Sequence, residues 1–143
     1  MDFNANQMRQ DALIPDGKYK FRVRDAREKR SQAGNDMLNL KLTLLVNGRE
    51  VQYWDSLILM PKMFWKFEHF CETAGLKDKL EAGRIMAQDC LNREGWIEIT
   101  QKVDSQTGVL ANQTKDYCLE PQELLPIADS DPTSLDDDIP NFS

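Results

Sequence analysis

The sequence predicts a mainly β domain, a five-stranded barrel with a helix between its third and fourth strands, followed by a disordered acidic tail. Three observations predict this fold. Several segments alternate apolar and polar residues with the two-residue period of a strand. One Asn-Gly pair marks a tight hairpin, and one apolar stripe has helical spacing. The 143 residues divide into a domain over 1–125 and a tail over 126–143.

The first strand is predicted from Lys18 to about Glu28, after a turn at Asp16-Gly17. Before it, residues 1–14 have no clean period, although Met8, Leu13 and Ile14 could cover an edge of the barrel. Within the strand, Tyr19, Phe21 and Val23 alternate with four cations, which therefore point to the opposite face. These cations are Lys18, Lys20, Arg22 and Arg24. Residues 31–36 form a polar loop.

The second and third strands form a hairpin. The second strand runs from Met37 to Val46, with leucines at 38, 40, 42 and 44 facing the core and Asn39, Lys41 and Thr43 facing outward. Asn47-Gly48 suits a type I′ turn, which needs positive φ at both central residues. The chain then returns from about Arg49 to Leu59. Because side chains alternate, either Tyr53 or Trp54 faces outward.

A helix is predicted to begin at Pro61 and to end at Gly75. Its core-facing stripe consists of Met63, Phe64, Phe67, Phe70, Cys71 and Ala74. Trp65 lies on the opposite side, and residues 77–92 form either a short second helix or an irregular connection.

The last two strands are predicted at Trp96–Val103 and Gln113–Leu119, joined by a turn over residues 105–108. In the fourth strand Ile97 and Ile99 face inward and Trp96 and Lys102 outward. Three strands, a helix and two further strands match the order of the OB-fold, a small Greek-key barrel. A generic β-barrel with a helical cap is the alternative.

Charge is segregated along the chain, although its formal net charge is −6. Residues 126–143 hold five acids and no base, and residues 18–30 hold seven bases and two acids. Alternate cations on a strand are about 7 Å apart, a spacing that resembles that of phosphates on an extended single strand. A row of this kind neutralises phosphates and releases their counterions. The alternative is a solvated strand face. The predicted cations are Lys18, Lys20, Arg22, Arg24, Arg27, Lys29, Arg30, Lys41 and Lys102.

Outward aromatic residues accompany these cations. Trp96 and one of Tyr53 and Trp54 are predicted to stack on bases, because ring stacking is how nonspecific single-strand binders hold bases. Trp65 also lies on an exposed face. The alternative for each ring is packing at the edge of the barrel.

The end of the chain carries the most specific motif, Leu135-Asp136-Asp137-Asp138-Ile139-Pro140-Asn141-Phe142-Ser143. It resembles the end of bacterial single-stranded-DNA-binding proteins (SSB), in which several Asp residues precede Ile-Pro-Phe. The resemblance implies that the tail recruits replication and recombination proteins. The recruiting residues would be Asp136, Asp137, Asp138, Ile139, Pro140 and Phe142. Two residues depart from that pattern: Asn141 is inserted before Phe142, and Ser143 moves the terminal carboxylate one residue beyond the Phe ring.

The body of the chain, from Ser31-Gln32-Ala33-Gly34-Asn35-Asp36-Met37 through the aromatic helix, is similar to a phage-encoded SSB group. The resemblance implies sequence-nonspecific binding and protection of single-stranded DNA in replication, recombination and repair. The rival class is an acidic interaction protein, such as an inhibitor or a DNA mimic that acts on a nucleic-acid enzyme. Oligomeric state is left open.

We expect neither catalysis nor a cofactor, because no P-loop, HExxH, GxSxG or Gly-rich dinucleotide turn is present. Asp55, Glu98 and Asp116 could meet as the metal ligands of a nuclease, but solvated strand positions are the preferred interpretation. Three cysteines without a CxxC pair and a single histidine argue against zinc and disulfides. Without a long apolar run or a secretory signal, we expect a cytoplasmic protein that binds no membrane, in the host cell if it is phage-encoded.

Overall fold

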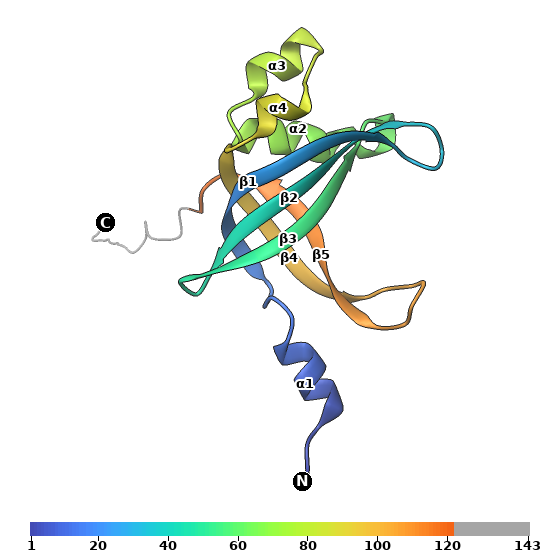
Figure 1. Cartoon of the computed structure of the whole chain (residues 1–143), viewed down its shortest axis with the longest axis vertical. Helices are drawn as coiled ribbons and strands as arrows, with labels where there is room; N and C mark the ends of the chain where they lie inside the picture. Colours follow the sequence, from blue (N-terminus) through green and yellow to red (C-terminus); the bar gives the residue numbers. More distant parts are fainter. Residues whose placement is uncertain (122–143) are drawn as a thin grey trace, which may run out of the picture.

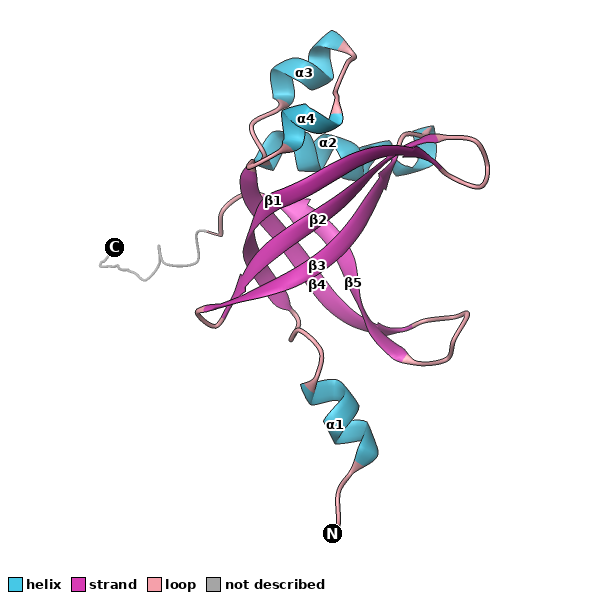
Figure 2. Ribbon diagram, in the orientation of Figure 1, coloured by secondary structure: helices cyan, strands magenta, loops and turns pink. Residues whose placement is uncertain are grey.

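The computed structural model describes residues 1–121, which form a curled antiparallel sheet with helices at its two ends (Figure 1). The strands are β1 (Gly17–Arg30), β2 (Asp36–Val46), β3 (Arg49–Ile58), β4 (Glu94–Val103) and β5 (Leu110–Cys118). The helices are α1 (Ala5–Asp11), the short 3-10 helix η1 (Pro61–Met63), α2 (Phe64–Thr73), α3 (Lys77–Ala82) and α4 (Ala87–Cys90). Helices α2, α3 and α4 gather at one end, and α1 extends from the other (Figure 2).

The spatial order of the strands is β3-β2-β1-β4-β5. Strand β1 is long enough to belong to both halves of the sheet, because Gly17–Arg22 pair with β4 and Phe21–Arg30 pair with β2. The sheet therefore curls into an OB-like barrel. The predicted mainly β fold, with its helix between the third and fourth strands, is confirmed. No backbone ladder joins the edge strands β3 and β5 of this sheet, so the barrel stays open along that seam.

The core lies inside the curl and follows the predicted alternation. Four leucines of β2 are buried together with Phe21, Ile97, Ile99 and Tyr117. The hairpin after β2 turns at Asn47, whose φ is 50°, and Gly48, whose φ is 80°, as a type I′ turn requires. The predicted β2–β3 hairpin is confirmed.

Helix α2 closes one end of the barrel. Phe67, Phe70, Cys71 and Ala74 are buried as predicted. The prediction was wrong for Phe64, which is 36% exposed because it lies at the rim, where its ring stacks on Phe67 with 6.0 Å between centroids. The chain leaves α2 at Gly75, whose φ of 74° few other residues adopt.

Gly95 on β4 lets α2 approach the sheet. A Cβ atom at this position would lie 2.8 Å from the Thr73 side chain and 2.9 Å from the Phe21 ring. The same close approach lets the Trp96 backbone N–H donate to Thr73 Oγ1 at 3.0 Å. Glycine is therefore required here by space rather than by backbone conformation.

The structure adds elements that the sequence pattern did not predict. Helix α1 has no buried residue and Met8 is exposed, whereas Ile14 is buried and donates its N–H to Asn112 Oδ1 at 2.9 Å. Of the three residues proposed to cover a barrel edge, Ile14 is the buried one. The uncertain stretch 77–92 contains two short helices, and the fifth strand begins earlier than predicted, at Leu110. No helix within residues 1–121 is long and apolar enough to cross a membrane. The predicted acidic tail lies outside the described residues, as does the predicted domain boundary at 125.

Candidate nucleic-acid interface

A β-bulge in β1 sets the direction of its cations. Val23 pairs with Leu42 and Asp25 with Lys41, so Arg24 is an extra residue on β1. If β1 alternated regularly beyond Val23, Arg27 and Lys29 would point toward the core. The extra residue shifts the phase by one, so both side chains lie on the outer face with the cations that precede them.

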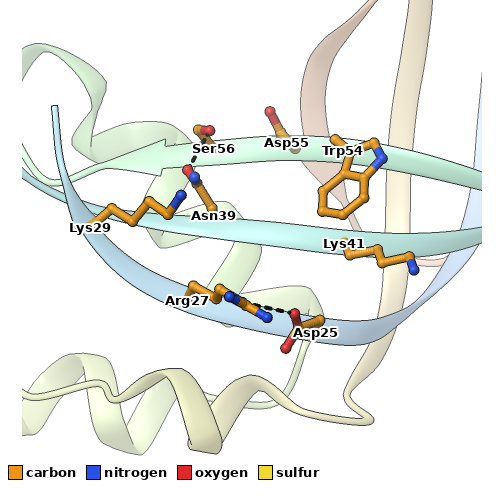
Figure 3. A pocket seen from close by; sticks show the side chains of 8 residues that line it. All are labelled: Asp25, Arg27, Lys29, Asn39, Lys41, Trp54, Asp55 and Ser56. Carbon is orange, nitrogen blue, oxygen red and sulfur yellow. Dashed lines mark hydrogen bonds and ion pairs between the residues drawn. The ribbon is translucent and has the colours of Figure 1, made fainter. Parts of the chain in front are cut away.

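The outer face of β1, β2 and β3 forms an open groove of about 570 Å³, called here the Trp54 groove (Figure 3). Its lining residues are Asp25, Arg27, Lys29, Asn39, Lys41, Trp54, Asp55 and Ser56. Two rows of cross-strand neighbours build it, Trp54–Lys41–Asp25 and Ser56–Asn39–Arg27. The groove thus combines three cations from two strands with one ring from a third.

Trp54 is the exposed ring of this groove. Its side chain is 66% exposed, and Lys41 Nζ lies 5.5 Å from the ring centroid. A cation above a ring face is attracted to the π-electrons and adds positive charge where a base would stack. A ring and a charge therefore stand side by side, open to solvent.

The two acids of the Trp54 groove are engaged by neighbours. Asp25 accepts hydrogen bonds from the Ala26 N–H at 3.0 Å and from Arg27 Nε at 3.1 Å, which stabilises the bulge. Asp55 borders the groove, but its side chain is largely buried, turns to the inner side of β3 and lies 3.0 Å from Lys66 Nζ. The carboxylates therefore fix local geometry, and three cations remain at the surface of the groove.

The first half of β1 carries Lys18, Lys20 and Arg22, all exposed on the outer face beside β4. Trp96 lies opposite Lys20 and is half-buried. Glu94 bridges two of these cations, with Oε1 3.5 Å from Lys20 Nζ and Oε2 accepting from Arg22 Nε at 2.9 Å. The Arg22 hydrogen bond and charge, followed by the charge of Lys20, hold the pKa of Glu94 below its ordinary value.

Two acids from other strands lie against these cations, although the sequence of β1 itself places no acid among them before Asp25. Glu94 comes from β4, and Glu50 from the β2–β3 hairpin lies 3.9 Å from Arg24 Nη2. Arg24 Nε also donates to Thr43 Oγ1 at 2.9 Å. All of these pairs are exposed, and exposed pairs contribute little to stability and exchange readily.

Tyr53 does not join the outer face. It pairs with Leu42, points to the inner side of β3 and shares a hydrogen bond of 2.9 Å with Thr114 Oγ1 on β5. Burial raises its pKa to about 12. Trp54 is therefore the outward ring of the pair.

Three other candidates lie apart from the Trp54 groove. Lys102 is exposed but sits beyond the part of β4 that pairs with β1. Arg30 ends β1, where it donates to the Gly34 carbonyl at 3.1 Å and lies 3.8 Å from Asp36, so it fixes the β1–β2 loop. Trp65 lies on α2, with its ring edge-on to His69 at 6.1 Å. The structure thus does not bring them to the ring and cations of the groove.

Sequence reasoning missed several residues of this face. Ser56 Oγ donates to Asn39 Oδ1 at 2.8 Å across the floor of the Trp54 groove. Asn39 was predicted to face outward but was given no role. Ser56 differs from Trp54 by two positions, so strand alternation alone could have placed it on the same face. Glu50 and Glu94 carry no such local signal.

The three carboxylates considered as metal ligands each contact a different side chain. Asp55 faces the inner side with Lys66, whereas Glu98 and Asp116 lie on the outer side with Lys115 at 3.8 Å and His69 at 2.9 Å. Within residues 1–121, no three His, Cys, Asp or Glu side chains are grouped to hold a metal. Cys71, Cys90 and Cys118 are free thiols, and the first two are buried.

Fold and site together define a small OB-like domain whose outer face presents cations beside an exposed tryptophan. Residues 1–117 match the family described as "Protein of unknown function (DUF669)". The chain belongs to this family. No curated protein matches it.

Proposed function

We propose that this protein binds and protects single-stranded DNA without sequence preference, in replication, recombination and repair. The observation that carries the proposal is the Trp54 groove, where an exposed ring lies beside Lys41 and across the face from Arg27 and Lys29. Rings and cations interleaved on an OB-like sheet are the combination that nonspecific single-strand binders use.

The division of labour follows from the chemistry of each group. Trp54 stacks on an unpaired base, and every base offers a π-face, so stacking carries little sequence information. Arg27, Lys29 and Lys41 neutralise phosphates and release counterions, which makes affinity dependent on salt. A paired base keeps its faces covered, so the groove selects single strands over duplex. The preference for DNA over RNA rests on the resemblance to SSB alone.

The proposal includes a second, noncatalytic role for the chain beyond the described residues. The acidic segment Asp136–Asp138 would steer the tip toward a basic partner, and Ile139 and Phe142 would supply the apolar anchors. The partners would be proteins of replication and recombination, in keeping with the resemblance of this segment to the SSB tail.

Tryptophan fluorescence tests the groove directly. Oligo(dT) should quench the emission of the full-length protein, whereas a duplex of the same length should not. Trp54→Phe should remove most of the quenching, and Trp54→Ala should weaken binding about tenfold, as expected for loss of one stacked base. Trp65→Phe is the matched control, because Trp65 lies on α2 away from the groove. Equal quenching by duplex, or loss of quenching only in Trp65→Phe, would contradict the proposal.

The alternative function, an acidic interaction protein such as a DNA mimic, is distinguished from single-strand binding by how oligo(dT) affinity depends on the charge of the tail. A full-length variant with Asp136, Asp137 and Asp138 replaced by Asn should bind oligo(dT) at least as tightly as the parent, because like charges no longer compete for the cations. A DNA mimic would show no binding to oligo(dT) in either form at low salt.

A further inference from the structure

The Trp54 groove does not end at Lys41. A second depression of about 400 Å³ shares Lys41 with it and extends past Thr43 to Arg24 and Glu50. A third, of about 240 Å³, shares those last residues and reaches Lys20, Arg22 and Glu94. The three depressions follow one another across the outer face through shared lining residues and are together called here the outer track.

Two carboxylates from other strands pair with the cations at the Lys20 end of the outer track. Glu94 holds Lys20 and Arg22, and Glu50 holds Arg24 from the opposite wall. The cations of the Trp54 groove at the far end are Arg27, Lys29 and Lys41. Arg27 also has an acidic partner, but that acid, Asp25, is held in place by the Ala26 N–H at 3.0 Å. Lys20, Arg22 and Arg24 are therefore the cations of the track that pair with carboxylates from other strands.

These acids are exposed, which distinguishes them from structural ion pairs. The Glu94 and Glu50 side chains are 38% and 71% exposed, and neither is fixed by a hydrogen bond from backbone N–H among residues 1–121. A carboxylate against a guanidinium has the same planar, charge-assisted geometry that a phosphate oxygen pair adopts on arginine. Because the pKa of Glu94 is lowered, it stays ionised at neutral pH.

We propose that Glu94 and Glu50 stand in for phosphates in the free protein, and that a bound single strand displaces them with successive phosphates along the outer track. The inference rests on the proposed function and deepens it, because it assigns phosphate subsites to Lys20, Arg22 and Arg24. In the free protein the two carboxylates keep these long side chains extended over the track. On binding, each carboxylate turns into solvent and recovers counterions.

The length of the outer track also limits how many nucleotides of single-stranded DNA it holds. Lys20 and Lys29 lie nine positions apart on β1, which spans about 30 Å at about 3.3 Å per residue. If each nucleotide takes the length of two strand residues, about four nucleotides fit, at the lower end of the range of roughly 4–16 for an OB-fold. One of them would stack on Trp54.

A displaced carboxylate has a measurable cost. It competes with phosphate for the same Lys and Arg side chains. Once released, it also attracts salt cations from solution, and this uptake offsets the counterions that the DNA releases. Glu94→Gln should therefore bind oligo(dT) about threefold to tenfold more tightly at low salt. Its plot of log affinity against log salt should be steeper by about 0.7, the value for one additional phosphate on a single strand. Glu50→Gln should act in the same direction, with a smaller effect because its contact is longer.

Glu98→Gln provides the matched control. Glu98 lies on the same strand as Glu94, on the same outer face, and pairs with Lys115 at 3.8 Å, but it lines none of the three depressions. The Glu98→Gln substitution therefore removes one negative charge from the full-length protein, as Glu94→Gln does, but at a position outside the outer track. An urea unfolding midpoint near that of the parent confirms that each variant is folded.

The titrations use fluorescein-labelled oligo(dT) and inorganic polyphosphate, a polyanion without bases. Tighter binding of both ligands by Glu94→Gln, with Glu98→Gln unchanged, supports the inference. An equal gain in Glu98→Gln, or no gain in Glu94→Gln, overturns it while leaving single-strand binding intact. If polyphosphate binding shows the Glu94 effect but oligo(dT) and duplex bind alike, the proposed function fails and the phosphate subsites stand. If no form binds either ligand, both are refuted.

Discussion

The carboxylate of Asp55 on β3 accepts a hydrogen bond of 2.6 Å from the hydroxyl of Tyr117 on β5. This contact spans the seam between the two edge strands, where the sheet has no backbone ladder. The Tyr53–Thr114 hydrogen bond lies on the same seam. Side chains thus join two edge strands that a closed barrel would join with backbone hydrogen bonds. Two of these side chains, Asp55 and Tyr53, come from β3, the strand that also presents Trp54.

Removing the charge of Asp55 should destabilise the fold strongly. Asp55→Asn leaves the largely buried ammonium of Lys66 without its carboxylate, so we expect a loss of about 3–5 kcal/mol in the free energy of unfolding. Tyr117→Phe keeps the ion pair and should cost about 1.5–3 kcal/mol. Urea unfolding measures both. The double variant Asp55→Asn, Lys66→Met should recover much of the lost free energy of unfolding. If it does not, the unpaired charge of Lys66 is not the cause of the destabilisation.

The salt dependence of binding should separate two exposed lysines. Lys29 lines the Trp54 groove and Lys102 lies beyond the part of β4 that pairs with β1. Lys29→Gln should weaken binding to every oligonucleotide alike and reduce the slope of log affinity against log salt by about 0.7. Lys102→Gln should leave the slope unchanged. A slope that falls equally in both variants would mean that net charge, and not position, governs binding.

Gly95→Ala should destabilise the protein by about 1–3 kcal/mol, because the new methyl group would overlap Thr73 and Phe21 in a packed core. Thr73→Ser removes the nearby methyl group but keeps the oxygen that accepts from the Trp96 N–H. In the Thr73→Ser background the cost of Gly95→Ala should therefore be smaller, which a double-mutant cycle of unfolding free energies measures. If the effects of the two substitutions on the free energy of unfolding are strictly additive, the methyl group of Thr73 is not the source of the clash.

The protein should lose stability in alkali. Burial raises the pKa of Cys71 from 9.0 to about 12 and that of Cys90 to about 11. The folded thiols therefore keep protons that the unfolded chain releases, so their contribution is complete below about pH 9 and is lost as the pH rises through the folded values. The decline should approach 1.4 kcal/mol per pH unit for each group at most.

Urea unfolding between pH 8 and about pH 11 checks this decline. Burial raises the pKa of Tyr53 and of Tyr117 in the same direction, so the fall should steepen above pH 10. Cys71→Ala should flatten the decline, and Cys118→Ala, at a half-exposed position, should flatten it less. Equal effects of the two substitutions would contradict burial as the cause.

The sequence predicts those parts of the fold that local patterns determine. The leucines of β2 and the Asn47-Gly48 turn specify a hairpin between neighbouring segments, so its strands, faces and turn follow directly. The helix after Pro61 follows from its apolar spacing. The approach of β3 to β5 along the seam does not follow from local patterns, because its side-chain contacts join residues about sixty positions apart.

The candidate site was predicted in composition more than in arrangement. Arg22 and Glu94 are 72 positions apart, and only the pairing of β1 with β4 brings them together. Tyr53 and Trp54 are both amphipathic rings, so alternation leaves two choices until the register with β2 selects one. The bulge at Arg24 did leave a trace, since the inward residues Val23 and Ala26 are three positions apart where regular alternation would give two or four.

That single extra residue has a consequence for comparing members of the family. Arg27 faces outward and lies four positions after the inward Val23, because Arg24 is the extra residue of the bulge. In a homologue without the bulge, the corresponding outward residue would lie three positions after the inward one. An ungapped alignment through this stretch would therefore equate outward cations in one chain with buried aliphatic residues in another. A one-residue deletion at this point should be tolerated between homologues, because the two halves of β1 would still present their charges to the same side.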